Sequence, residues 1–491
     1  MPDSPLDLYG LGTDPSPAAQ LLSSRQRRIG VAIVVVVAAA AVAAPLLTAR
    51  LFVALCTAVY LAVAIFKGRI VRDAFRRVTD TEAQTPPRPP RLRDHELPTY
   101  TVLVPLFHEG NVVRPLVSYL GRLDYPADKL EIFLLCETED DETIDVIRSI
   151  DLPAQFRLVV CPPGEPRTKP RACNVGLALS KGDLCVIYDA EDRPDLDQLR
   201  LAAETFAVAD ERVVCLQARL DYHNHQHNWL TRFFTVEYNH WFDLLLPALA
   251  QRDMPIPLGG TSNHFYSWAL RDLRGWDPYN VTEDADLGMR IYAAGGCTGI
   301  LDSVTLEEAC AQLRPWIRQR TRWLKGYLQS WTVQMRSGAV RRRGGWRGVG
   351  AMHLLLGGTP TVNLLNPIFW TMFFYFAVTR ADWVIQLFPG PMVYIAAASL
   401  VVGNVLFAYL NIVAVVHRER WHLLHAALLT PLYWLMMSWA TWRACAQLVR
   451  KAHVWEKTPH GLSGADTDPA TMTAPAPVAP RSAVGLSGAT A

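Results

Sequence analysis

Charged residues are scarce in this chain of 491 amino acids: Asp, Glu, Lys and Arg together make up 19% of it, whereas hydrophobic residues make up 50%. This balance is unusual for a soluble globular protein and favours a chain with segments inside a membrane. Basic and acidic residues nearly cancel, which leaves a formal net charge of +2. This net charge says little about partners, but membrane topology explains the local clusters of arginine beside apolar runs, so we expect no nucleic-acid partner.

Cys-x-x-Cys pairs are absent, although the sequence contains nine cysteines. Several cysteines lie within apolar runs, such as Cys136 in IFLLC and Cys185 in LCVIYD. This distribution excludes a zinc-ribbon site and a dense disulfide framework, and it is typical of reduced thiols in a buried core.

Long charge-free runs account for much of the missing charge. Residues 29–49 form a run of 21, enough to cross the ~30 Å hydrocarbon core of a bilayer, and 51–66 form a second run of 16. The residues that flank this pair are basic: Arg25, Arg27, Arg28, Lys67, Arg69, Arg72, Arg76 and Arg77. By the positive-inside rule both outer ends are cytoplasmic. The sequence therefore predicts a cytosolic segment over 1–28 and a transmembrane helical hairpin over 29–66.

A second apolar region predicts transmembrane segments over 346–445. It opens with a charge-free run of 32 residues, 348–379, in which GGTP at 357–360 is expected to separate an interfacial or re-entrant piece from a span at 361–379. Further spans are expected at 391–416 and 421–442. Basic residues stand at both ends of the last one, which leaves its topology open. The remaining 446–491, rich in Ala, Pro, Thr and Ser, predict a cytosolic or disordered tail.

Between the two apolar regions, the sequence predicts a linker over 67–96 and then a domain over 97–345. The linker contains several prolines among charges. The domain contains four apolar, β-branched runs with helical periodicity between them: TYTVLVPLF, KLEIFLLCE, RLVVCP and GDLCVIYDAED. Strands that alternate with helices predict an α/β sheet of the doubly wound type, in which ligands bind beyond the carboxyl ends of the strands.

Acidic residues follow three of these strands. Glu109 follows the first, Glu137 ends the second, and YDAED places Asp189, Glu191 and Asp192 at the end of the fourth. Such carboxylates suit a divalent cation bridged to a diphosphate, but a helix N-cap is an equally good explanation for YDAED.

Two further polar features lie between and beyond the strands. Glu283 and Asp284 precede a helix-like run, where capping is again the alternative to a catalytic role. Lys169 precedes another predicted helix, where its ammonium group can lie beside phosphates or remain on a solvated surface.

The stretch RPWIRQRTRWLKGYLQSW, residues 314–331, predicts a helix rich in arginine and tryptophan. Gln319, Arg322 and Trp323 share one helical face, because they stand at i, i+3 and i+4. An amide, a guanidinium and an indole together can hold a sugar and a phosphate. The same helix can also lie on an anionic membrane surface, so the residues alone leave both interpretations open.

Taken together, four motifs occur in one order: Glu137, Asp-Ala-Glu-Asp at 189–192, Thr-Glu-Asp at 282–284 and Gln-Arg-Thr-Arg-Trp at 319–323, followed by apolar runs. This order resembles the family 2 membrane glycosyltransferases of the cellulose synthase-like type, the processive β-glycan synthases. The likeness covers roughly 97–460, and HVWEKTPHG at 453–461 is similar to bacterial members. The resemblance implies an α/β GT-A (Rossmann-like) cytosolic catalytic domain inserted between transmembrane helices of a multi-pass protein.

The resemblance also implies a role for each matched position. Asp284 corresponds to the general base, and Glu137 corresponds to the acid that contacts the nucleotide base. Asp189 and Glu191 correspond to the metal-binding acids of the D-x-D motif, for Mg²⁺ or Mn²⁺, with Asp192 as the alternative to Glu191. The residues expected to contact the donor or acceptor are Glu109, Lys169, Glu283, Gln319, Arg322 and Trp323.

The implied activity is inverting, metal-dependent transfer from a nucleotide diphosphate sugar, with UDP-sugars favoured, onto a growing polysaccharide, by a processive mechanism. The expected partners are the donor, a glycan acceptor, the lipid bilayer and export proteins, and the expected location is the plasma membrane with the catalytic domain in the cytoplasm. We expect no downstream cyclic-dinucleotide-binding domain. Two alternatives stay open: single transfer to a lipid or glycan acceptor, and a catalytically inactive membrane receptor or scaffold.

Overall fold

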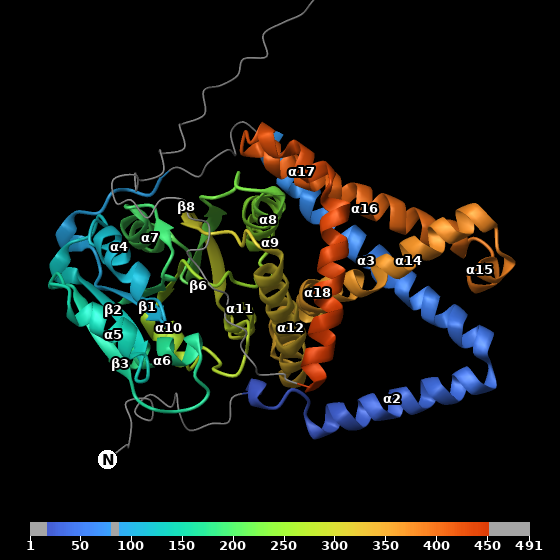
Figure 1. Ribbon diagram of the computed structural model, residues 1–491, viewed down its shortest axis with the longest axis horizontal. Coiled ribbons are helices and arrows are strands. Elements are labelled where there is room, and N and C mark those ends of the chain that lie inside the picture. Colours follow the sequence, from blue (N-terminus) through green and yellow to red (C-terminus); the bar gives the residue numbers. More distant parts are fainter. Residues whose placement is uncertain (1–16, 80–87, 451–491) are drawn as a thin grey trace, which may run out of the picture.

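The computed structural model describes residues 17–79 and 88–450 of the chain. Within these residues an α/β domain stands beside a group of long helices. Figure 1 shows α12 (Leu313–Ser337) between the sheet of the domain and the long helices.

The domain is built on one eight-stranded sheet with the order β3-β2-β1-β4-β7-β6-β8-β5. Its strands are β1 (Tyr100–Leu106), β2 (Leu130–Glu137), β3 (Phe156–Cys161), β4 (Leu184–Ile187), β5 (Arg193–Pro194), β6 (Val213–Tyr222), β7 (Asn263–Tyr266) and β8 (Cys297–Glu307). The four predicted strands are confirmed as β1 to β4, and they pair in parallel. The sheet as a whole is mixed, because β7 pairs antiparallel with both β4 and β6.

Alternate residues of the central strands supply two separate cores. Leu103 of β1 and Phe133 of β2 belong to one hydrophobic cluster, whereas their neighbours Val102 and Ile132 belong to another. Since successive side chains on a strand point to opposite faces, the sheet is buried on both faces. The helices of this half are α4 (Gly110–Leu120), α5 (Asp141–Arg148), α6 (Lys169–Leu179) and α7 (Gln198–Val208).

The second half of the domain brings α11 close to the loop that precedes β7. A Cβ at Gly288 of α11 would lie 1.9 Å from the carbonyl oxygen of Ile256, so only glycine permits this approach. The helical segments here are α8 (Trp229–Asn239), the π-helical η4 (His240–Leu245), α9 (Leu246–Ala250), α10 (Ser267–Asp272) and α11 (Glu283–Ala293).

The remaining helical segments include several long apolar helices. They are α2 (Ser24–Ala43), α3 (Pro45–Thr79), α13 (Ala339–Met352), the π-helical η5 (His353–Gly358), α14 (Thr359–Thr379), α15 (Asp382–Leu387), α16 (Met392–His417), α17 (Leu424–Leu428) and α18 (Thr430–Arg450). In the described residues, four helical stretches are long and apolar enough to cross a membrane. The bent pair Trp421–Leu428 and Thr430–Arg450 makes a fifth if it counts as one span.

Two predicted boundaries in these helices are wrong. The linker expected from residue 67 begins later, because α3 continues without interruption to Thr79. The break expected at 357–360 does not occur, because η5 keeps the chain helical from α13 into α14. A π-helical turn accommodates the two glycines there without ending the helix. The tail predicted from 446 begins as the last turn of α18, and the rest of it, with 453–461, lies outside the described residues.

The last described helix, α18, packs mainly along α12 and also contacts α14 and α16 (Figure 1). The bend between the two members of the 421–450 pair is 58°.

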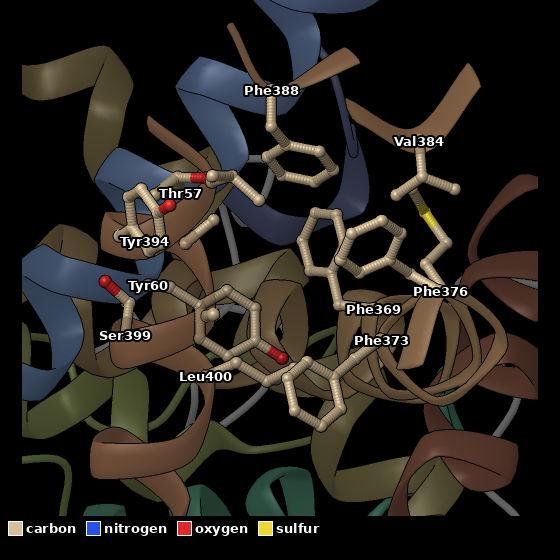
Figure 2. A pocket seen from close by; sticks show the side chains of 14 residues that line it. Thr57, Tyr60, Phe369, Phe373, Phe376, Val384, Phe388, Tyr394, Ser399 and Leu400 are labelled. Carbon is tan, nitrogen blue, oxygen red and sulfur yellow. The ribbon is translucent and has the colours of Figure 1, made fainter. Parts of the chain in front are cut away.

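An apolar pocket of about 250 Å³ lies among α3, α14, α15 and α16. Figure 2 shows Phe369, Phe373, Phe376 and Phe388 around it, with Tyr60 at one side. Two hydroxyl groups in its wall are used within the protein: that of Tyr60 donates to Asn366 over 2.8 Å, and that of Ser399 donates to the carbonyl of Ile395 over 2.7 Å. The lining therefore suits hydrocarbon and not a polar ligand.

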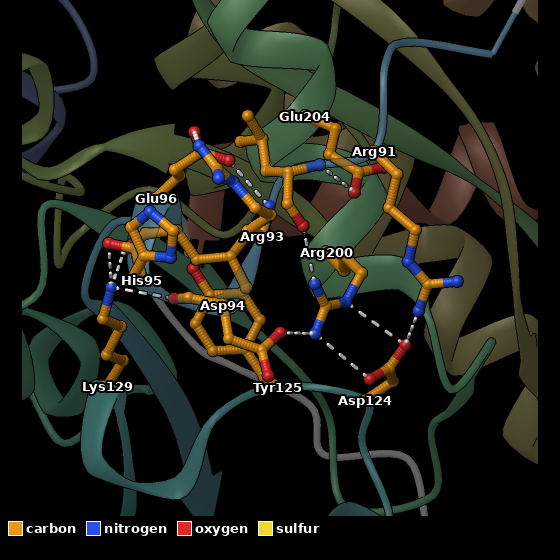
Figure 3. Close-up of polar contacts among 12 residues, drawn as sticks. Arg91, Arg93, Asp94, His95, Glu96, Asp124, Tyr125, Lys129, Arg200 and Glu204 are labelled. Carbon is orange, nitrogen blue, oxygen red and sulfur yellow. Dashed lines mark hydrogen bonds and ion pairs between the residues drawn. The ribbon is translucent and has the colours of Figure 1, made fainter.

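Polar contacts hold residues 92–97, the segment that leads into β1, as Figure 3 shows. The Nζ atom of Lys129 donates to the carbonyls of Asp94, His95 and Leu97 over 2.7 to 2.9 Å. Arg200 of α7 is only 6% exposed and donates to the carbonyl of Leu92 over 3.1 Å and to the Asp94 carboxylate over 2.7 Å. These contacts set where the chain enters β1.

Replacing Arg200 by Ala is therefore expected to lower the thermal unfolding temperature of the detergent-solubilised chain by several degrees. The variant loses packing and charge-assisted hydrogen bonds, worth roughly 1 to 3 kcal/mol together. Arg91→Ala is the matched control, because the Arg91 side chain is 76% exposed and only meets Asp124 at 3.5 Å. Equal unfolding temperatures for the two variants would show that the Arg200 contacts do not hold this segment.

Candidate active site

Glu109 stands at the end of β1, where the chain turns into α4. Its backbone N–H donates to the Thr143 hydroxyl over 3.0 Å, and its carboxylate accepts from the backbone N–H of Phe107 over 3.4 Å. The preceding His108 has a φ of 52°, and its N–H donates to Asp140 over 2.6 Å. The turn is thus held by side chains from the start of α5, and Glu109 stays half-buried at the strand end.

Glu137 at the end of β2 is buried and paired with Arg171 of α6. Their closest oxygen and nitrogen atoms are 3.1 Å apart. Burial raises the pKa of Glu137, while the charge and the hydrogen bond of Arg171 act in the opposite direction. Sequence reasoning missed Arg171, since an arginine one turn into a predicted helix gives no sign of a partner 34 positions earlier.

Lys169 and Asp189 meet at the carboxyl end of β4. The Nζ atom of Lys169 donates to an Asp189 carboxylate oxygen and, over 2.8 Å, to the carbonyl of Gly260. Burial lowers the pKa of Lys169, but the charges of Asp189 and Glu283 outweigh it and raise the pKa above its usual value. Lys169 is therefore a buried cation inside the site and not a surface lysine.

The two acids that follow Asp189 have different surroundings. Asp192 is 3% exposed, and its carboxylate accepts from the Thr261 hydroxyl and, over 2.8 Å, from the backbone N–H of Asp189. Burial raises the pKa of Asp192 well above its usual value. Glu191 is half-buried. Of the two, Glu191 is the more accessible partner for a ligand at Asp189.

Glu307, which sequence reasoning missed, adds a further carboxylate beside these acids. β5 pairs with β8 through Arg193 and Leu306, so Glu307 lies one position beyond that pair, across from Asp192. Burial and the neighbouring Asp192 and Asp189 raise the pKa of Glu307. The only signal was an acidic pair after an apolar run, at Glu307 and Glu308.

Glu283 and Asp284 form the first turn of α11. Burial and the neighbouring Asp284 raise the pKa of Glu283 to about 8, against the opposing charges of Lys169 and Arg322. Burial also raises the pKa of Asp284. A Cβ at Gly260 would lie 3.4 Å from an Asp284 carboxylate oxygen. The loop that contains Gly259 and Gly260, which we call the glycine loop, therefore passes directly beside this acid.

Arg322 of α12 brings a second cation to the same place. Burial lowers the pKa of Arg322, while the charges of Glu283, Asp284 and Asp189 act against that shift. The structure therefore brings together the predicted residues from three motifs. The two cations, Lys169 and Arg322, lie among three carboxylates. Burial disfavours the charged form of each cation, and the carboxylates of Asp189, Glu283 and Asp284 act as the counterions that offset this cost.

The register of α12 on α11 is set by small and polar side chains. A Cβ at Gly326 would lie 2.4 Å from the Thr282 side chain, immediately before Glu283. Asn280 donates to the Ser330 hydroxyl over 2.9 Å, and the backbone N–H of Val281 donates to Gln329 over 3.2 Å. α12 is not a surface helix, because its residues are buried on the sides that face α11 and α18.

Gln319 and Trp323 lie on α12 near α8. Gln319 is 9% exposed, and its Oε1 atom accepts no hydrogen bond from the described residues. The Trp323 ring stacks on Tyr238 at a centroid distance of 6.4 Å, and the Arg320 guanidinium lies 4.5 Å from the centre of the Trp323 ring. Arg320 in turn pairs with Glu237. Trp323 is thus only partly buried, in an aromatic wall that continues toward the long helices.

Within the described residues, no three His, Cys, Asp or Glu side chains are grouped so as to hold a metal ion by themselves. Asp189 and Glu191 can supply two hard oxygen donors, which suit Mg²⁺ or Mn²⁺. The other ligands of the metal must come from groups besides these two side chains. The oxygens of a diphosphate are hard donors, as carboxylate oxygens are. The residues therefore fit a metal that binds together with a diphosphate.

Comparison with known proteins agrees with this geometry. Residues 98–326 match the family model described as "Glycosyltransferase like family 2". A probable glycosyltransferase from Bacillus subtilis is 28% identical over 252 residues, which cover 48% of this chain and 57% of the relative. A β-monoglucosyldiacylglycerol synthase from Synechocystis is 27% identical over 246 residues, 48% of this chain and 50% of the relative. The chain thus spans about half the length of the curated relatives that it matches.

A probable glucomannan 4-β-mannosyltransferase from Arabidopsis thaliana is 25% identical over 251 residues, 47% of this chain and 45% of the relative. Among solved structures, a mannosyltransferase from Pyrobaculum calidifontis in complex with GDP-Man and Mn²⁺ has a TM-score of 0.53 and 19% identity. The match covers 82% of this chain and 99% of that one, and it shows a shared fold. Residues 98–326 of this chain thus match a family 2 glycosyltransferase model, and the chain shares its fold with a solved mannosyltransferase.

Proposed function

We propose that the chain transfers a hexose from a nucleotide diphosphate sugar, with UDP-sugars favoured, onto a growing polysaccharide at the membrane, with inversion at the anomeric carbon. The observation that carries this proposal is the convergence of Lys169 and Arg322 with the carboxylates of Asp189, Glu283 and Asp284. An inactive receptor or scaffold has no need to keep this set of buried charges together, because burying charge is costly.

In the proposed reaction, an acceptor hydroxyl attacks the anomeric carbon and the bond to the diphosphate breaks on the opposite side. Asp284 accepts the proton of the hydroxyl, and its raised pKa makes the carboxylate a stronger base than an exposed aspartate. Arg322 and Lys169 stabilise the negative charge that develops on the diphosphate. Glu137 and Arg171, at the next strand end, contact the nucleotide base.

Asp189 and Glu191 would hold the divalent metal, Mg²⁺ or Mn²⁺. When bound, the metal supplies positive charge that neutralises the leaving diphosphate. Asp192 is already used by Thr261 and by the backbone of Asp189, so its proposed role is to hold the turn that presents the other two acids.

The acceptor is proposed to enter along α12, where Gln319 and Trp323 lie between the site and the long helices. The basic residues around the first two helices support a location in the plasma membrane, with the domain in the cytoplasm where nucleotide sugars are made. A second candidate is single transfer to a lipid acceptor. It is favoured by the relatives that are β-monoglucosyldiacylglycerol synthases. A donor panel with linkage analysis of the products, long polymer against a single added sugar, decides between the two.

Asp284→Asn is expected to lower the transfer rate about 10²- to 10⁴-fold while donor binding changes by no more than a few fold, because the amide keeps the shape but cannot accept a proton. Release of nucleoside diphosphate measures the rate, and isothermal titration measures donor binding. The control is Asp272→Asn, since Asp272 is exposed at the end of α10. Turnover within a factor of about three of the unmutated chain would remove Asp284 from the role of base.

Asp189→Ala is expected to weaken UDP binding about tenfold or more when Mg²⁺ or Mn²⁺ is present and to change it little in chelator, because the carboxylate acts through the metal. Glu191→Gln is expected to act in the same direction. Titration of UDP with and without metal checks both variants. If the unmutated chain bound UDP equally with and without metal, the proposed metal role would be wrong.

Trp323→Leu is expected to lower polymer yield roughly five- to 150-fold while membrane insertion and donor binding persist, because an acceptor sugar loses its stacking surface, worth about 1 to 3 kcal/mol. Incorporation from radiolabelled donor measures the yield. Trp439→Leu serves as the matched control, because Trp439 of α18 is 66% exposed and is not packed against α12. Full polymer yield from Trp323→Leu would leave this tryptophan with a packing role alone.

A further inference from the structure

Two segments more than 300 positions apart meet where the long helices begin. The Nε2 atom of Gln26, near the start of α2, donates to the carbonyl of Thr332 over 2.8 Å, and its Oε1 atom accepts from Nε of Arg336 over 2.8 Å. The start of α2 is thereby held against the end of α12. The next helix, α13, starts two residues after α12 ends.

Both segments carry exposed arginines. The exposed set comprises Arg25, Arg27 and Arg28 on α2 and Arg341, Arg342 and Arg347 on α13. Neither 17–66 nor 309–381 contains an Asp or Glu. The nearby acid Asp253 pairs instead with Arg343, which is turned inward, and with Arg212. The six exposed arginines therefore carry charge of one sign on two segments that α12 connects, and together we call them the basic surface.

A tryptophan completes this surface. α13 is kinked at Gly345, which has a φ of 54° and a ψ of −147°, and the following Trp346 is 73% exposed. The Arg341 guanidinium lies 4.6 Å from the centre of the Trp346 ring. An exposed indole beside arginines is typical of side chains at the depth of lipid headgroups.

The lengths of the helices place the basic surface at that depth. The helical stretch Ala339–Thr379 has 41 residues, whereas a bilayer needs only about 20, so its first turns extend beyond the hydrocarbon. The arginines of α2 likewise come immediately before the charge-free run that starts at residue 29. Both sets of arginines therefore stand next to apolar helical stretches that are long enough to cross a membrane, where basic side chains meet lipid headgroups.

We propose that the basic surface, with Trp346, is a binding site for the headgroup phosphates of anionic phospholipids in the surrounding bilayer. The guanidinium groups can fork onto phosphate oxygens, and zwitterionic lipids lack the net charge that a surface without acids attracts. This site is separate from the sugar-transfer site and does not depend on the proposed function.

The test uses the purified full-length chain with equal amounts of phosphatidylglycerol and phosphatidylcholine, and native mass spectrometry counts the lipids that stay bound. The unmutated chain is expected to enrich phosphatidylglycerol over phosphatidylcholine. The triple variant Arg341→Gln, Arg342→Gln, Arg347→Gln is expected to lose about tenfold or more of this preference, since each basic residue near an anionic surface contributes substantially to binding. The matched control changes three exposed arginines on the far side of the domain, Arg114, Arg148 and Arg157, to Gln.

A second variant separates charge from folding. Replacing the same three α13 arginines by Lys keeps the charge, and it is expected to retain most of the phosphatidylglycerol preference. The proposal is overturned if the triple Gln variant keeps the preference of the unmutated chain, or if the far-side control loses as much. It is also overturned if the Lys variant loses as much as the Gln variant, or if both lipids are lost equally.

Discussion

The structure depends on keeping two cations among three carboxylates, of which Glu283 is buried and the other groups are partly buried. Lys169 and Arg322 reach the site from α6 and α12, and the acids come from the end of β4 and the first turn of α11. Removing either cation would leave carboxylates uncompensated in a buried place, which is more costly than an exposed mispairing. The close approaches at Gly260, Gly288 and Gly326 keep these charges together, because they fix how near α11 and α12 lie to each other and to the loop before β7.

The same helix that supplies Arg322 also joins the domain to the long helices. One side of α12 packs on α11 through Gly326, and the other packs on α18. Arg320 pairs with Glu237 of α8, which also accepts a hydrogen bond from Tyr433 of α18 over 2.6 Å. One ion pair thus connects three helices from both parts of the protein. The proposed acceptor side of the site is therefore part of the junction between the domain and the long helices.

Sequence reasoning reached the first half of the sheet, because β1 to β4 are apolar runs and β1, β2 and β4 are buried on both faces. It missed β7, since NHFY is short and partly polar, and its antiparallel pairing depends on neighbours distant in sequence. It placed Asp189, Asp284 and Arg322 in one site through motif order. It could not find Arg171 or Glu307, whose partners are set only by the fold. It also left the surroundings of α12 open, because a helix with many arginines has the composition of a surface helix even when ion pairs bury it.

The position of α12 also has a consequence for the order in which the protein is made. Its end is held by Gln26, which leaves the ribosome early, whereas its other side is covered by α18, the last helix described. During translation, α12 is therefore complete before α18, the helix that packs on it. Arg322 and Arg320 are then present before Tyr433 has been synthesised. Helix α12 reaches its final packing only after α18 has packed against it. The packing around α12 at the candidate site is thus completed by one of the last segments in the chain order, although the charged groups of the site precede it.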